Sequence, residues 1–231
     1  MRTAAIIVAG GTGARFGREG GKQLARLAGA SVLGHTLQAF EACDAIDEVV
    51  LVVHSDRVAE YAIEAAGTLK VEGIIAGGDR RQDSVAAGLA ALSADVEVVV
   101  VHDGARPLVT PAIISEAVEC LVTSGAEGVV VGHPAYDTMK RVDGDGAVVG
   151  TEDRSTLWVA QTPQVFRAAR LRHAFALAEE EGFAGTDDAS FVERHGGRVV
   201  MILGPRDNIK VTVPEDLALV ERLLEARGEH S

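Results

Sequence analysis

Residues 3–17 read TAAIIVAGGTGARFG, an apolar run that passes directly into a glycine-rich turn. The run does not alternate between apolar and polar residues, so it fits a central parallel strand that is covered on both faces. Glycines at such a turn let backbone amides approach phosphate oxygens without an intervening side chain. A dinucleotide-binding turn has a similar pattern, and the residues that follow must distinguish the two.

Similar apolar runs recur along the chain, separated by segments with helical spacing. Further strands are predicted at 48–53, 71–76, 96–101, 127–131 and 198–203. Helices are predicted at 31–42, 56–66, 81–93, 111–124, 167–181, 187–195 and 214–227. This alternation predicts a doubly wound, three-layer α/β sheet, and 231 residues suit a single domain over 1–231.

Residues 134–165 interrupt the alternation. Two short strand-like runs flank Asp143-Gly144-Asp145-Gly146, whose Asp-Gly pairs supply the positive φ values of a tight hairpin. A lone hairpin buries too little surface to be stable by itself. We therefore expect an arm at about 134–163 that packs on a second subunit or over the active site. A tolerated surface insertion is the alternative.

The composition argues against several classes of partner. A net charge of −12 and only 4% aromatic residues disfavour nucleic acid. No apolar stretch is long enough to span a bilayer, and the N-terminus does not resemble a signal peptide, so we expect a cytoplasmic protein without a membrane partner. Cys43 and Cys120 lie far apart and are expected to be small buried hydrophobes.

A group of cations follows the glycine-rich turn, against the acidic character of the whole chain. Its members are Arg15, Arg18, Lys22 and Arg26, with a single acid, Glu19, among them. Glycines at 17, 20 and 21 oppose the immediate helix that a dinucleotide turn requires. This pattern predicts a clamp for a triphosphate, with a solvated basic loop as the alternative.

Three later segments place polar residues at strand ends, where open α/β sheets bind ligands. The first, Gly77-Gly78-Asp79-Arg80-Arg81, enters a helix that Asp79 is a candidate to cap. The second, His102-Asp103-Gly104-Ala105-Arg106, offers an acid for magnesium or substrate and a planar fork for phosphate. His102 is expected to be structural, and Lys210 in the third segment is a candidate phosphate contact.

Tyr136 and Lys140 match the spacing of the catalytic pair of short-chain dehydrogenases, which lies on a helix. Pro134 and the following Gly-Asp-Gly turns argue against a helix here. We therefore expect no dehydrogenase site at this position.

Taken together, these segments resemble the 2-C-methyl-D-erythritol 4-phosphate cytidylyltransferases. The resemblance is carried, in the family's order from about residue 3 to residue 225, by VAGGTGARFG, Lys22-Gln23, GGDRRQDSV, VHDGARP, DTMKR, EDRSTLW, QTPQVF and DNIKVT. Gly10 and Gly104 stand where alanine is frequent, and Val8 where proline is frequent. The resemblance implies a Rossmann-like nucleotidyltransferase sheet with a projecting β-hairpin arm, a homodimer formed through that arm, and Mg²⁺ as cofactor.

The resemblance also implies roles for single positions. The residues that act on the reacting phosphates would be Arg15, Lys22, Arg154 and Lys210. The CTP would be held by Ala9, Gly10, Gly11, Gly13, Gly78, Asp79, Arg81, Ser84 and Asp103. The polyol phosphate would be held by Arg106, Thr138, Arg154 and Thr162, with Arg154 from either subunit. Asp103 would also hold the metal.

The implied reaction is transfer of CMP from CTP to 2-C-methyl-D-erythritol 4-phosphate with release of pyrophosphate, in the non-mevalonate route to isoprenoids. A phosphate oxygen is already anionic near neutral pH, so no general base is expected, and cations supply the catalysis. Three alternatives remain open from the sequence: a ribitol 5-phosphate cytidylyltransferase, a reductase that uses a dinucleotide, and a nucleotide sensor without turnover.

Overall fold

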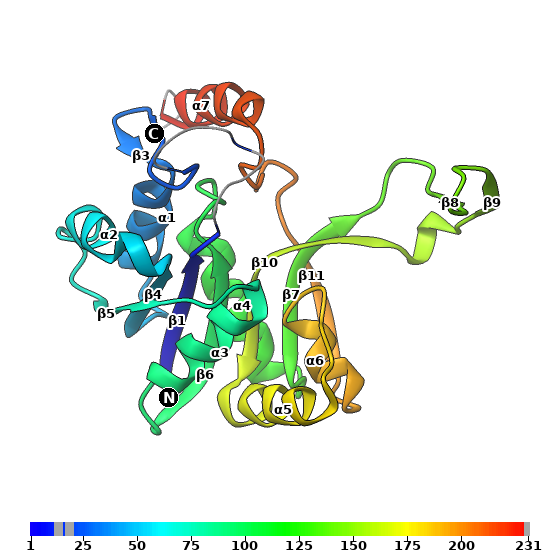
Figure 1. The fold of residues 1–231 in the computed structure, drawn as a ribbon, viewed down its shortest axis with the longest axis horizontal. Coiled ribbons are helices and arrows are strands. Elements are labelled where there is room, and N and C mark those ends of the chain that lie inside the picture. The colour runs from blue at the N-terminus through cyan, green and yellow to red at the C-terminus, as the bar shows by residue number, and fades with distance from the viewer. Residues whose placement is uncertain (12–15, 17–20, 229–231) are drawn as a thin grey trace.

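The structure is a computed structural model that describes residues 1–11, 16 and 21–228. A seven-stranded sheet forms its centre, in the order β11-β7-β10-β6-β1-β4-β5 (Figure 1). The bounds of these strands are β1 Arg2–Ala9, β4 Glu48–Val53, β5 Val71–Ala76, β6 Val96–Asp103, β7 Gly128–Pro134, β10 Trp158–Arg167 and β11 Val199–Leu203. Six of the seven correspond to the strands predicted from the sequence.

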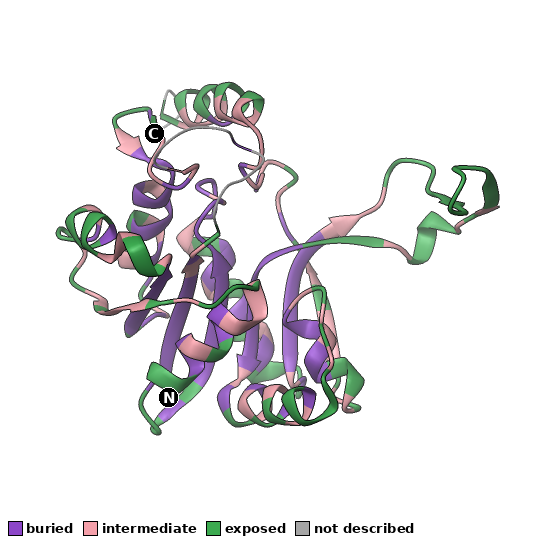
Figure 2. Cartoon of the chain, viewed as in Figure 1, coloured by how far each residue is buried: buried purple, intermediate pink, exposed green. Residues whose placement is uncertain are grey.

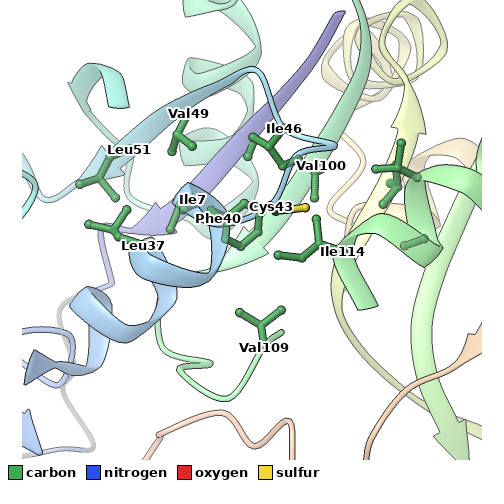
Figure 3. Close-up of a cluster of buried hydrophobic side chains, with 14 of the residues drawn as sticks. Ile7, Leu37, Phe40, Cys43, Ile46, Val49, Leu51, Val100, Val109 and Ile114 are labelled. Atoms are coloured by element: carbon green, nitrogen blue, oxygen red, sulfur yellow. The ribbon is translucent and has the colours of Figure 1, made fainter. Parts of the chain in front are cut away.

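Helices cover both faces of the sheet, which confirms the predicted three layers. Along β1, Ile7 packs in one buried cluster with α1 and α4, whereas Ile6 packs in a second cluster with α3, α5 and α6. This follows from the period-2 alternation of side chains on a strand. The helix bounds are α1 Val32–Glu41, α3 Arg81–Ala91, α4 Pro111–Thr123, α5 Ala168–Glu181 and α6 Ala189–Arg194. Figure 3 shows Phe40 and Leu37 of the first cluster beside Ile7.

The ends of these helices follow local chemistry. The side chain of Ser31 accepts a hydrogen bond from the amide of Gly34 and so caps α1. Thr110 caps α4 in the same way, and Pro111 occupies the first turn, where its missing N–H costs nothing. The predicted helix at 56–66 is split into a 3-10 turn, η1 Ser55–Arg57, and α2 Val58–Glu64.

The last helix, α7 Pro214–Gly228, lies beyond the end of the sheet (Figure 1). Its Val220 joins a third buried cluster with Phe16, Leu27 and Leu108. A small two-stranded sheet, β2 Arg26–Leu27 and β3 Ala30–Ser31, connects the glycine-rich segment to α1. Within the described residues, none of the helices combines the length and apolar content that crossing a bilayer requires.

The six predicted strands run parallel to one another, but the expectation that they are all central is wrong, because β5 and β11 are the edge strands of the sheet. The seventh strand, β10, lies antiparallel between β6 and β7. β10 was not predicted because Pro163 interrupts its apolar run, and proline normally argues against a central strand. The structure accommodates it at a register irregularity between Ala160 and Gln164.

The predicted arm is present and projects from the sheet (Figure 1). The chain leaves through β7 and returns through β10, which is why β10 runs antiparallel to its neighbour. The tip carries β8 Lys140–Val142 and β9 Val148–Thr151, followed by the 3-10 turn η2 Arg154–Thr156. Gly146 has a φ of +83°. Gly144 has no such φ, so the expectation that both Asp-Gly pairs supply one is wrong. The arm is exposed along its length, in contrast to the buried sheet (Figure 2).

Candidate active site

A cavity of about 300 Å³ opens where strands β1, β4, β5 and β6 end. This is the edge at which ligands bind in open α/β sheets. The described residues that line it are Val8, Gly10, Gly11, Lys22, Gln23, His54, Gly78, Asp79, Arg80, Arg81, Ser84, Asp103, Ala105 and Lys210. Most of the positions predicted to hold a nucleotide are thus brought together from three separate segments of the chain.

A larger groove of about 770 Å³ lies elsewhere, between α3 and α5. Apolar side chains such as Leu89, Phe175 and Phe183 form much of its lining. It shares only Arg80 with the smaller cavity. The chemistry therefore assigns the candidate active site to the smaller cavity, which holds the predicted cations and glycines.

Tight packing explains the glycine at position 78. A Cβ atom added there would lie 2.4 Å from Cβ of Asp83, closer than two carbons can approach. The segment between β5 and α3 therefore passes close to the first turn of that helix. Ser84, in the same turn, is buried and directs its hydroxyl to the carbonyl oxygens of Gly78 and Arg80.

The two adjacent arginines of this segment have different partners. Arg80 is exposed and pairs with Asp83, whose carboxylate accepts hydrogen bonds from the backbone amide and the guanidinium of Arg80. Arg80, and not Asp79, is the N-cap residue of α3, so the candidate cap at Asp79 is wrong. Asp79 instead lines the cavity.

Arg81 belongs to a group of charges around two buried carboxylates, here called the Asp103 cluster, which comprises Arg81, Asp103, Arg106, Asp188 and Lys210. Nε of Arg81 donates to Oδ1 of Asp103 at 3.1 Å. The other oxygen, Oδ2, lies 2.9 Å from Nζ of Lys210 and 3.5 Å from Nε of Arg106. Burial alone would raise the pKa of Asp103, but the attraction of these three cations holds it far below its usual range.

Asp188 is a member of this cluster that sequence reasoning missed. It is fully buried, and its two oxygens accept hydrogen bonds from Nη1 and Nη2 of Arg81 at 3.0 and 2.8 Å. The available signal was an acidic pair, Asp187-Asp188, at the start of the helix predicted at 187–195. Acids are common at helix starts, so nothing in that pattern pointed to an arginine 107 positions away.

His102 and Thr162 form hydrogen bonds to the backbone of the Asp103 cluster. The hydroxyl oxygen of Thr162 lies 3.0 Å from Nδ1 of His102 and accepts a hydrogen bond from the amide of Asp103 at 3.1 Å. Nε2 of His102 lies 3.3 Å from the carbonyl oxygen of Arg106. Burial lowers the pKa of His102 to about 3, so the imidazole is neutral near neutral pH. This agrees with the structural role expected for His102.

None of the four predicted acceptor contacts, all of which the structure describes, is among the residues that line the cavity. Arg106 is half-buried beside Asp103 and donates from Nη1 to the carbonyl oxygen of Asn208 at 2.7 Å. Thr162 is buried, with its hydroxyl directed to the groups just described. Thr138 and Arg154 are exposed on the arm, where Nη1 of Arg154 donates to the carbonyl oxygen of Tyr136 at 2.6 Å.

Several other predictions can be located. Ala9 is buried at the end of β1, outside the lining of the cavity. Gly13 and Arg15 lie outside the described residues, so their predicted roles have no structural account. No helix includes Tyr136 or Lys140, as expected from the glycine-rich turns. Cys43 is buried and Cys120 is partly buried, and neither forms a disulfide.

No group of three or more histidine, cysteine, aspartate or glutamate side chains among the described residues is arranged to hold a metal ion. The carboxylates that line the cavity are Asp79 and Asp103. The described residues therefore offer no site for a metal held by protein ligands alone, whereas an ion shared between one of these carboxylates and a bound phosphate would fit.

Comparisons with known proteins agree with these features. A family model for 2-C-methyl-D-erythritol 4-phosphate cytidylyltransferase, IspD, matches residues 3–226. The chain is 42% identical to the 2-C-methyl-D-erythritol 4-phosphate cytidylyltransferase of Geotalea uraniireducens, over 98% of each chain. It is 44% identical to the protein of that name from Alkaliphilus metalliredigens, over 97% of this chain and 93% of the relative.

Solved structures match the whole fold. The 4-diphosphocytidyl-2C-methyl-D-erythritol synthase of Anaerococcus prevotii has a TM-score of 0.85 at 27% identity, covering 97% of this chain and 96% of that one. The 2-C-methyl-D-erythritol 4-phosphate cytidylyltransferase of Thermus thermophilus has a TM-score of 0.79 at 30% identity, covering 97% of this chain and all of the other. This chain therefore belongs to the 2-C-methyl-D-erythritol 4-phosphate cytidylyltransferase family.

Proposed function

We propose that this protein transfers CMP from CTP to 2-C-methyl-D-erythritol 4-phosphate, giving 4-diphosphocytidyl-2-C-methyl-D-erythritol and pyrophosphate. The observation that carries the proposal is the family match over residues 3–226, joined to a cavity that gathers the family's motif residues at one sheet edge. This activity is a step of the non-mevalonate route to isoprenoid precursors.

The chemistry is an in-line substitution at the α-phosphorus of CTP. An oxygen of the acceptor phosphate forms the new bond to this phosphorus, and the bond to the bridging oxygen of the β-phosphate breaks. The departing pyrophosphate keeps the electron pair. The attacking oxygen is already anionic, so the barrier is the meeting of two anions. His102 does not line the cavity, both of its ring nitrogens have hydrogen-bond partners, and its low pKa makes it a weak base, which is consistent with a reaction that needs no general base.

Cations and backbone groups of the cavity account for binding and charge stabilisation. Lys22 and Lys210 line the cavity and would contact the triphosphate. Gly10, Gly11 and Gly78 present backbone that a nucleotide can approach closely. Arg15 is assigned the same role only because it lies in the glycine-rich motif. Arg106 would meet the acceptor phosphate if that phosphate displaces the long contact to Asp103.

Magnesium fits this site as an ion shared between protein and substrate. Mg²⁺ usually binds one or two carboxylates together with substrate phosphates and keeps several waters. Asp79 and Asp103, both at the cavity, are the residues that would hold it, Asp103 through the second lone pair of Oδ1, which its single contact with Arg81 leaves available. When bound, the ion would neutralise part of the triphosphate charge.

We also propose that the arm acts together with a second copy of the chain. Val142, Val148 and Val149 on the arm are 52%, 61% and 58% exposed, which is unusual for three apolar side chains on one short hairpin. Thr138 and Arg154 lie on the same arm, away from the cavity of their own chain. A homodimer in which the arm packs against the second subunit would cover the apolar surface and bring these residues to the partner's acceptor.

The test is pyrophosphate release from CTP and Mg²⁺ with 2-C-methyl-D-erythritol 4-phosphate and ribitol 5-phosphate supplied separately. Release with the first acceptor alone is the expected result. Release with the second alone would keep the chemistry and replace the acceptor. Release with neither, under conditions in which CTP binds, would contradict the enzymatic function and favour a nucleotide sensor.

A further inference from the structure

Asp188 lies outside the cavity yet contacts a residue that lines it. It immediately precedes α6 and is fully buried, with 0% of its surface exposed. Both of its carboxylate oxygens receive hydrogen bonds from the terminal nitrogens of Arg81. Arg81 lines the cavity, and Asp188 does not. Its pair of hydrogen bonds with Arg81 is therefore the direct contact by which Asp188 can influence the cavity.

The guanidinium of Arg81 transmits this contact to Asp103. While Nη1 and Nη2 are held by Asp188, Nε donates to Oδ1 of Asp103 at 3.1 Å. A guanidinium is planar and rigid, so fixing its two terminal nitrogens also fixes the direction of Nε. Asp103 in turn presents its other oxygen to Lys210 at 2.9 Å. The position of Lys210 at the cavity thus depends on a chain of contacts that begins at Asp188.

Asp188 is itself held firmly. Its neighbour Asp187 accepts a hydrogen bond from Nε2 of Gln164 at 2.9 Å, and Oε1 of Gln164 accepts one from the amide of Ala189 at 3.0 Å. Gln164 is a buried residue of β10. These bonds attach the start of α6 to the central sheet on both sides of Asp188. The backbone that carries the Asp188 carboxylate is therefore held in place.

Charge balance gives Asp188 a second consequence. Burial disfavours the charge of Arg81, but the attraction of Asp188 and Asp103 outweighs it and raises the pKa of Arg81. Without the charge of Asp188, Asp103 would be the remaining carboxylate paired with this buried guanidinium. The guanidinium, no longer held by Asp188, would turn to pair more fully with Asp103 and draw it away from Lys210.

We propose that Asp188 is a positioning residue for cytidylyl transfer, which holds Arg81 so that Asp103 stays aligned with Lys210 at the cavity. This inference rests on the proposed function of the same site. The competing role is purely structural: Asp188 would clip α6 to α3, and its loss would lower stability without a specific effect on the reaction.

A double-mutant cycle between Asp188→Asn and Arg81→Lys separates the two roles. Lysine cannot make the paired contact, so a residue that acts through Arg81 loses its influence in that background. We expect Asp188→Asn to lower kcat for pyrophosphate release by about 10- to 100-fold in the wild-type background, as supporting contacts typically do. In the Arg81→Lys background we expect roughly a threefold change or less.

The outcomes are read together with thermal unfolding of each variant. Equal losses of kcat in both backgrounds, or a wild-type kcat with a lowered melting temperature, would overturn the positioning role. If Asp188→Asn does not fold, Asp188→Glu replaces it in the same cycle, because it keeps the charge but moves the carboxylate by one methylene. The same comparison of kcat losses and melting temperatures then decides between the positioning role and the structural role.

Glu181→Gln provides the matched control. Glu181 forms an exposed ion pair with Arg194 at 2.6 Å between α5 and α6, the helix that Asp188 precedes, and it does not line the cavity. Its substitution should leave kcat unchanged. A wild-type protein that releases no pyrophosphate would overturn the proposed function together with this inference. An active wild type with equal losses in the two backgrounds overturns this inference alone.

Discussion

The Asp103 cluster and the arm both carry residues predicted to bind substrate, but their surroundings differ sharply. In the cluster, Asp103 and Asp188 are buried and each contacts a guanidinium within 3.1 Å. On the arm, Thr138 and Arg154 are exposed, as are the apolar side chains around them. Contacts within one chain therefore fix the nucleotide side of the site in advance. The two arm residues predicted to bind the acceptor are exposed, and our proposal is that a second subunit completes their site.

The largest expected effect is at the nucleotide side. Lys22→Ala removes a cation at the cavity, and we expect kcat to fall by about 10²- to 10³-fold, as for loss of one donor that stabilises developing charge. Because Lys22 is only partly buried, the melting temperature should change little. Steady-state pyrophosphate release and thermal unfolding check both statements. A wild-type kcat in this variant would remove Lys22 from the mechanism.

The next effect distinguishes an arm that serves its own chain from one that serves its partner. Arg154→Ala should lower kcat by about 10²-fold, since misplacing a substrate costs that order. In a heterodimer of Arg154→Ala with Lys22→Ala, one of the two sites would be intact if the arm crosses to the other subunit. We then expect about half of the wild-type activity.

Co-expression with two different affinity tags allows this heterodimer to be purified, and the two mutant homodimers are the controls. Activity no higher than that of the homodimers would mean that the arm completes the site of its own chain. A protein that remains monomeric at assay concentration, with full activity, would remove the arm from the dimer proposal altogether.

The third prediction concerns the stability of the folded protein and depends on the buried His102, not on the arm. His102 has a folded pKa of about 3 against an ordinary value of 6.5. As the pH falls below about 6.5, the unfolded chain takes up a proton that the folded protein does not. Stability is therefore lost between pH 6.5 and 3. At pH 4.5 the loss in the free energy of unfolding amounts to about 2–3 kcal/mol.

His102→Asn should remove this part of the pH dependence, which is measured as the difference in unfolding free energy between pH 4.5 and 7.5. At pH 7.5 the imidazole is neutral in both states, so that measurement isolates the packing cost of the substitution. An unchanged pH dependence in His102→Asn would show that another group is responsible.

The smallest effect tests whether the arm folds together with the domain. Gly146→Ala places a side chain at a φ of +83° and should weaken the hairpin by about 1 kcal/mol. Because the arm is exposed, we expect its bonds to open without global unfolding. The amides of Asp143 and Ala147, which bond across the turn, should exchange roughly fivefold faster.

Gly144→Ala is the matched control, since Gly144 has no positive φ and a Cβ there meets open space. It should leave exchange at both amides unchanged. A loss of global stability in Gly146→Ala would mean instead that the arm and the domain unfold as one unit.

The sequence by itself determined the order of helices and six of the seven sheet strands. It also located the residues of the cavity, including Gly78, Arg81, Asp103 and Lys210. These predictions succeed because apolar periodicity and turn chemistry depend on neighbours along the chain. The family's motifs also lie at strand ends, which the alternation of elements brings to one edge of a sheet.

Only the tertiary structure decided three further features. β10 enters the sheet despite Pro163, because pairing with β6 and β7 on both sides outweighs the local cost. Arg80 and Arg81 are neighbours in sequence, yet one pairs locally with Asp83 and the other pairs with Asp103 and Asp188. Asp188 becomes part of the site only because folding brings α6 to α3. Buried charges must find partners, and which partner is near depends on the packing of distant segments, which no local pattern encodes.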